Sequence, residues 1–374
     1  MSQKELFNLF ILGLVLVVLG FLYRRFEAKQ MREENGDNYA AIKEYLLDDV
    51  TLGKSKKPIL WIHVPYEYNS RKWLSFGSRS SFDLNQPYLY LTVRSIIKKC
   101  EESFTVCIFD DNSFAKLLPN WSIDMTRLAD PILSNMRLLG KMKLLHTYGG
   151  LMCPLSFLCM RDLSEMYTKG TRGNKMFVCE TVDRNSTSVR MNFFPNVCFC
   201  GAPKECHMVA ELCNYIQLIS SRDQSADVKF LGEYDRWIMD RIERGQINMI
   251  EGVEIGTRTV DDKQIIIDDL MSNNYLDLYK GTYGILIPAN ELLNRIQFGW
   301  FIRMSPRQVL ESDTIIGNYL LLSVGPEKDQ GILEPLQMDP KWVGFWRVPS
   351  GAPVWGLKPI DLGDNINMIK YPGR

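Results

Sequence analysis

The amino-acid sequence predicts an α/β fold with a mixed, mainly parallel sheet, and the order of its apolar segments carries this prediction. Short runs rich in β-branched and aromatic residues alternate with longer segments that have helical spacing. The first two runs each end where a strand is expected to stop, at Pro65 and at Asp110. Strands and helices that alternate at this pace are typical of a sheet with helices packed on its faces.

The first half of the folded part is expected to begin at Pro58. It contains predicted strands at residues 59–64 (ILWIHV) and 104–109 (FTVCIF), and a helix with a basic last turn at residues 89–100. A longer helix is predicted over residues 130–148, because a proline opens it, apolar residues recur three and four apart, and a glycine pair closes it.

More strands and helices are predicted after residue 150, and the pattern weakens beyond about residue 245. Further strands are expected at residues 151–160, 177–180, 193–200, 265–270 and 283–287, and further helices at 201–220, 230–244 and 292–309. The last fifty residues predict loops that close over the same domain. In open α/β sheets, ligands bind beyond the carboxyl ends of the strands. Asp110 and Asp111 follow one such end, and residues 151–156 lie near another.

The N-terminal segment differs from the globular remainder. Residues 6–23 (LFNLFILGLVLVVLGFLY) carry no charge, and at about 1.5 Å per residue they match a bilayer core of about 30 Å. A single-pass transmembrane helix within residues 1–25 is therefore expected to bind the lipid bilayer. A cleaved signal peptide and a buried helix are the alternatives, but the absence of an A-x-A-like site before Arg24 favours an uncleaved anchor.

The orientation of this anchor stays open. Residues 26–57 are expected to form a charged stalk between the anchor and the domain at 58–374. Arg24, Arg25 and nearby basic residues follow the segment, so the positive-inside rule places the domain in the cytoplasm. Two N-glycosylation sequons, at Asn120 and Asn185, would be used only in a lumenal domain.

Overall composition excludes some classes of function. The chain has 374 residues, of which 46% are hydrophobic, so it can bury a large core. Lys plus Arg and Asp plus Glu both number 44, and this balance provides no global field for nucleic acid. Nine cysteines argue against a fully paired disulfide framework. The spacing of Cys198, Cys200, Cys206, His207 and Cys213 matches no C-x-x-C zinc pair, which favours small buried hydrophobes over a metal site.

The order of elements resembles a known enzyme family. A strand ILWIHV, a helix, a strand ending in FDDN, a helix ending in LLHTYGG and a short strand resemble the glycosyltransferases with a D-x-D sugar-binding region, family 32. This family includes inositol-phosphoceramide mannosyltransferases and bacterial capsular-polysaccharide transferases. The resemblance covers residues 58–215, with its core between 104 and 163.

The resemblance implies a GT-A fold, with a nucleotide-sugar half at residues 58–220 and an acceptor or closing half at 221–374. It also implies transfer of a sugar from a nucleotide-sugar donor to a glycan or glycolipid acceptor, and a lumenal domain behind a membrane anchor. The family otherwise holds Mn²⁺ or Mg²⁺ through its D-x-D acids.

The motif residues that matter for metal binding are replaced here. Gly149 and Gly150 match the family's two glycines, and the resemblance implies that they bind the donor. In this alignment, Lys141 takes the place of an Arg. Pro154 and Ser156 then take the places of the two aspartates. A divalent ion needs hard carboxylate oxygens, which neither side chain provides.

Three sets of residues are candidates to compensate. Asp110 and Asp111 are candidates for donor binding, or for Mn²⁺ or Mg²⁺, with a strand-to-turn cap as the structural alternative. A basic side chain, Lys141 or Arg161, is a candidate to stabilise the diphosphate without metal, with solvated charges as the alternative. Glu233 or Asp235 is a candidate general base, with the solvent-exposed face of an amphipathic helix as the structural alternative.

Three functions follow from these observations. The first is a membrane-anchored glycosyltransferase-like enzyme. The second is a catalytically inactive GT-A scaffold that binds glycans or assembles at a membrane. The third is an unrelated α/β protein whose glycine pair matches by chance.

Overall fold

The computed structural model describes residues 57–65, 86–118, 121–128, 131–182, 193–222, 232–273, 275–302 and 304–325. The expected anchor at 6–23, nearly all of the stalk, and the sequon residues Asn120 and Asn185 lie outside these residues. Within the described part, no helix is long and apolar enough to cross a membrane.

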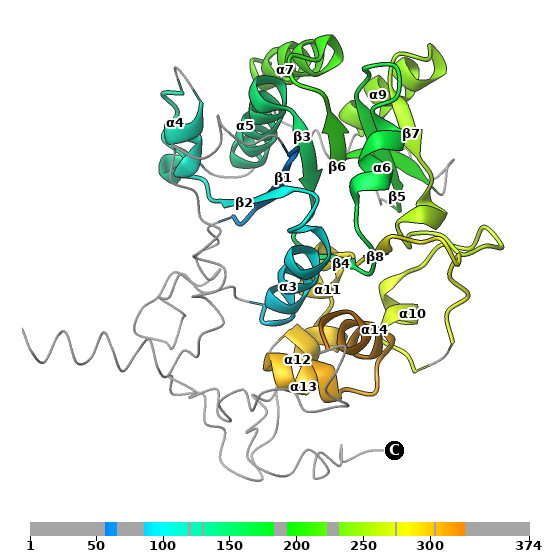
Figure 1. The fold of residues 1–374 in the computed structure, drawn as a ribbon. Coiled ribbons are helices and arrows are strands. Elements are labelled where there is room, and N and C mark those ends of the chain that lie inside the picture. The colour runs from blue at the N-terminus through cyan, green and yellow to red at the C-terminus, as the bar shows by residue number, and fades with distance from the viewer. Residues whose placement is uncertain are drawn as a thin grey trace, which may run out of the picture.

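The centre of the molecule is a six-stranded sheet with the order β2-β1-β3-β6-β5-β7 (Figure 1). Its strands are β1 Ile59–His63, β2 Thr105–Phe109, β3 Gly150–Cys153, β5 Phe177–Thr181, β6 Phe194–Ala202 and β7 Asn248–Ile250. Strand β1 is parallel to β2 and β3, β5 is parallel to β7, and β6 is antiparallel to both of its neighbours. The predicted α/β fold with a mixed, mainly parallel sheet is confirmed.

Helices cover both faces of this sheet, which explains why β1 is buried along its whole length. The long helix α5 (Ile132–Tyr148), together with α7 (His207–Ser220) and α9 (Glu233–Glu243), packs into the core on one face. The short helix α4 (Ser113–Leu117) joins the same core, and the 3-10 helix η3 (Met125–Arg127) follows it. Helices α3 (Tyr88–Cys100) and α6 (Ser164–Gly170) cover the other face.

A third core lies at the end of the molecule away from α5 and α7 (Figure 1). Here β4 (Phe157–Cys159) pairs antiparallel with β8 (Gly284–Leu286). Small helices surround this pair: η4 Gly252–Glu254, α10 Ile267–Leu270, α11 Ala289–Asn294, η5 Ile296–Phe298, α12 Gly299–Ile302, α13 Pro306–Glu311 and α14 Ile315–Val324. The α3 helix contributes to this core through Leu89 and Leu91, so it joins the two parts.

Three of the predicted elements are wrong. The single strand predicted at 151–160 is two strands, β3 and β4, because the chain turns at Pro154 and leaves the large sheet. The strand predicted at 265–270 is mostly helix α10, since the Asp269 carboxylate accepts from the Ile266 N–H at 3.1 Å and closes the first turn. The helix predicted at 292–309 is broken into several short pieces.

The glycine pair before β3 is required by backbone geometry. Gly149 has φ +73° and Gly150 has φ +110°, and L side chains rarely adopt such values. A Cβ on Gly150 would lie 2.2 Å from the Ile59 carbonyl oxygen of β1. The indole N–H of Trp61 donates to the Gly149 carbonyl at 2.9 Å. This turn therefore fixes the position of the end of α5 relative to β3 and β1.

We predict that Gly150→Ala lowers the free energy of unfolding by about 3 kcal/mol or more, because backbone strain adds to a clash with β1. Gly245→Ala is the matched control: its φ is +67°, but no atom lies within 4 Å of the added Cβ. It should cost about 1 kcal/mol. Urea denaturation of both variants measures the difference, and equal losses would contradict the close approach to Ile59.

Candidate functional site

The carboxyl ends of three neighbouring parallel strands meet at one edge of the sheet. His63, the last residue of β1, is opposite Phe109 of β2, and Ile62 is opposite Cys153 of β3. The residues that follow, Asp110 and Asp111 after β2 and Pro154 after β3, are therefore brought to the same edge. This is where ligands bind in open α/β sheets.

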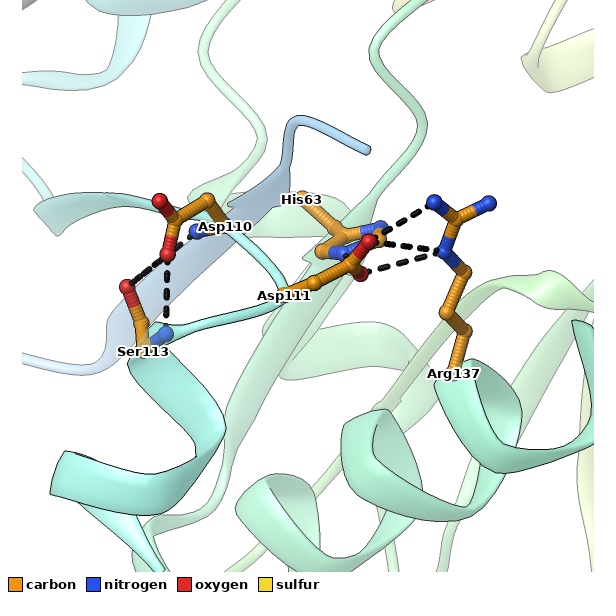
Figure 2. Close-up of polar contacts among 5 residues, drawn as sticks. All are labelled: His63, Asp110, Asp111, Ser113 and Arg137. Carbon is orange, nitrogen blue, oxygen red and sulfur yellow. Dashed lines mark hydrogen bonds and ion pairs between the residues drawn. The ribbon is translucent and has the colours of Figure 1, made fainter. Parts of the chain in front are cut away.

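Asp111 lies at the centre of this edge, between two partners (Figure 2). Its Oδ1 is 2.8 Å from His63 Nε2. The Arg137 guanidinium donates to both carboxylate oxygens, with Nε at 3.0 Å and 3.1 Å and Nη2 at 2.7 Å. All three side chains are largely buried. This fork geometry is typical of strong, oriented ion pairs.

Burial and the contacts among His63, Asp111 and Arg137 set the protonation of His63 and Asp111. Burial alone would raise the pKa of the Asp111 carboxyl, but hydrogen bonds from His63 and Arg137 outweigh it and lower this pKa to about 2. Burial, together with the nearby Lys141 cation, lowers the pKa of His63 to about 4 against the opposing effect of Asp111. His63 is thus neutral near pH 7, and its Nε2 carries the proton because the ionised carboxylate can only accept.

Lys141 lies on α5 four residues after Arg137, so the two cations share one face of the helix. Helical side chains lean toward the helix N-terminus, which here means toward the strand ends. The Lys141 ammonium is in electrostatic reach of Cys198, Arg137, Asp111 and His63. Within the described part of the chain, it makes no hydrogen bond or ion pair.

The electrostatic neighbours of Lys141 indicate that its ammonium lies near the end of β3. Cys200 of β6 is opposite Met152 of β3. Because β6 is antiparallel to β3, Cys198 lies two residues further toward the edge, level with Pro154. Burial lowers the pKa of Lys141, and the Arg137 charge lowers it further. Lys141 therefore lies beside the strand end where the resemblance expects acids.

Asp110 turns away from the edge, as Figure 2 shows. Its Oδ1 accepts from the Ser113 N–H at 2.8 Å and from the Ser113 hydroxyl at 2.6 Å. These contacts close the turn that begins α4. Gly149 and Gly150 lie at the amino end of β3, opposite the edge that holds Asp111, where they shape the turn from α5.

Pro154 and Ser156, which the resemblance lays on two aspartates, have structural roles. Pro154 follows β3 directly and ends its pairing in the large sheet. Ser156 is buried, and its hydroxyl donates to the Ile287 carbonyl at 2.8 Å, which ties β3 and β4 to the segment after β8. Among the described residues, no group of three or more His, Cys, Asp and Glu side chains is placed to hold a metal ion.

The remaining candidates lie elsewhere. Arg161 follows β4 at the end away from Pro154, where its Nη1 donates to the Gly281 carbonyl at 3.0 Å and its guanidinium lies over Tyr283. Glu233 and Asp235 lie in the first turn of α9, and Asp235 is buried. Arg161 is thus engaged outside the strand edge.

Sequence reasoning missed His63 and Arg137. His63 could have been found as the last residue of a buried strand that ends beside Asp111 in the sheet. Arg137 could have been found by its spacing from Lys141, since two cations four residues apart interrupt the apolar pattern of α5.

Comparison of the chain with protein-family models, curated proteins and solved structures finds no significant match to any of them.

We predict a pH dependence of stability that His63 causes. The folded protein holds His63 neutral down to about pH 4, whereas an unfolded His binds a proton below about pH 6.5. The stabilisation is therefore complete above pH 6.5 and is lost by about 3 kcal/mol as the pH falls from 6.5 to 4.

The test compares wild-type protein with His63→Gln, whose amide is neutral and still donates to Asp111. Urea denaturation between pH 4 and 7.5 gives the difference in free energy of unfolding at each pH. His146 and His207 are common to both proteins and cancel. The free energy of unfolding of wild-type protein should fall relative to that of His63→Gln by about 3 kcal/mol between pH 6.5 and 4. A difference that stays constant over this range would show that His63 titrates normally.

Proposed function

We propose that the chain is a membrane-anchored protein whose domain has a GT-A-like fold and resembles glycosyltransferases. It binds a nucleotide-sugar donor at the carboxyl edge of β1, β2 and β3, and it transfers the sugar to a glycan or lipid acceptor. The segment at residues 6–23 is proposed to hold the domain at a bilayer, with residues 26–57 as a stalk. The family-like order of elements between residues 104 and 163 supports this assignment.

The observation that carries the proposal is the charge at the strand edge. Arg137 and Lys141 provide two cations, Asp111 provides one carboxylate, and His63 is neutral near pH 7. The cluster therefore has an excess of one positive charge, held at the carboxyl edge of the sheet, where open α/β sheets bind ligands. A donor diphosphate is an anionic group complementary to it.

A second candidate, the inactive scaffold, is favoured by the state of the acids at this edge. Asp110 accepts hydrogen bonds from Ser113, and Asp111 accepts them from His63 and Arg137. Neither carboxylate is left as an obvious general base, which an acceptor hydroxyl would need. Donor binding without transfer would follow from this arrangement.

We predict that at least one nucleotide-diphosphate sugar raises the melting temperature of the full-length protein in detergent micelles. At a concentration 100 times Kd, binding adds about 2.7 kcal/mol to stability, which corresponds to a shift of several degrees. The free nucleoside, which lacks the diphosphate, is the control and should give a smaller shift.

Turnover distinguishes the two candidates. Release of free nucleoside diphosphate in the presence of glycan or glycolipid acceptors indicates an enzyme, whereas a thermal shift without release indicates the scaffold. No thermal shift with any donor, with or without Mn²⁺, and no release of nucleoside diphosphate would contradict the enzyme.

A further inference from the structure

The residues at the carboxyl edge of β1, β2 and β3 do not fit the divalent ion that the family resemblance implies. Mn²⁺ and Mg²⁺ prefer charged oxygen ligands. The two motif positions hold Pro154, which has no side-chain oxygen, and Ser156, whose buried hydroxyl donates to Ile287. The substitutions therefore remove both the negative charge and the ligand geometry at the end of β3.

The neighbouring aspartates do not restore such a site. Asp111 is the acid nearest the edge, but both of its oxygens accept hydrogen bonds from the Arg137 guanidinium. A divalent ion on the same carboxylate would lie close to two cations, Arg137 and Lys141, and like charges repel. Asp110 accepts hydrogen bonds from Ser113 at the start of α4.

The two cations have different roles in this arrangement. The guanidinium of Arg137 is held by Asp111, which satisfies Nε and Nη2 and fixes its position. Lys141 has three donors on its ammonium and no hydrogen-bond or ion-pair partner among the residues that the structure describes. Lys141 interacts electrostatically with Cys198, and the register of β6 against β3 puts Cys198 level with Pro154, one of the two positions that the resemblance lays on the family's aspartates.

Resting on the proposed function, we infer that the Lys141 ammonium takes the place of the metal ion, so that the donor diphosphate binds without any divalent cation. Arg137 adds to the positive field, and Asp111 acts as the positioning residue that keeps Arg137 in place. An ammonium supplies one positive charge where a divalent ion supplies two, and the charge of Arg137 is paired with that of Asp111, so the cluster carries a net charge of +1.

The test measures binding of inorganic pyrophosphate to full-length protein in EDTA by isothermal titration calorimetry. Wild-type protein is expected to bind. Lys141→Met should weaken binding by about 10- to 100-fold, because it removes a charge-assisted hydrogen bond while keeping the length of the side chain. Lys141→Arg keeps the charge and should restore most of the affinity.

Lys143→Met is the matched control. Lys143 lies on the same helix, and its ammonium contacts the ring of Trp121 instead of the strand edge. The same substitution there should change affinity by less than about 2-fold, since it alters the net charge of α5 without touching the site. Thermal unfolding of each variant checks that the fold is retained.

The outcomes separate this inference from the proposed function. Pyrophosphate binding that needs Mn²⁺, or that Lys141→Met leaves unchanged, would overturn the inference even if nucleotide sugars bind. Pyrophosphate binding in EDTA that depends on Lys141 supports it. If no nucleotide sugar binds in that case, the proposed function fails and the diphosphate site stands.

Discussion

The buried contact between Asp111 and Arg137 organises this end of the molecule. It joins the end of β2 to α5, and through His63 it also joins β1, so three elements of the chain share one carboxylate. Removing a charge pair from water is costly, so such a contact adds little net stability. Loss of one partner nevertheless destabilises the folded protein strongly, because the other charge is left buried and unpaired. What it provides is a unique arrangement of α5 over the strand ends.

The position of α5 is also fixed by packing. A Cβ on Gly140 would lie 2.6 Å from the ring of Phe114, so the helix approaches α4 as closely as a glycine allows. At its other end, the turn at Gly149 and Gly150 leads directly into β3. Between these two constraints, the face of α5 that carries Arg137 and Lys141 can reach only the carboxyl edge of the sheet.

The electrostatics of the edge follow from this placement. Asp111 is kept ionised and His63 is kept neutral, so the local charge is decided by Arg137 and Lys141. In a partly buried site, each of these charges acts through a lower effective dielectric than in water. A site with this balance is suited to a phosphate-containing ligand, and the same balance disfavours a divalent cation. The absence of acids at Pro154 and Ser156 and the presence of Lys141 are both consistent with this balance.

The local pattern of the sequence determined much of the large sheet. Strands β1 and β2 and helices α3 and α5 were predictable because each has a clear apolar period and recognisable end residues. The small helices around β4 and β8 were not, because their segments are short and their conformation depends on packing in the third core.

The sequence by itself also determined that the chemistry of a metal-binding D-x-D motif is missing, since Pro154 and Ser156 can be read directly. Only the tertiary structure decided what the neighbouring residues do instead. Arg137 meets Asp111 across 26 residues of sequence, and Ser156 meets Ile287 across 131. Contacts of that range depend on strand register and helix placement, which no local pattern specifies, and they assign Asp111 to Arg137 and leave Lys141 at the strand edge.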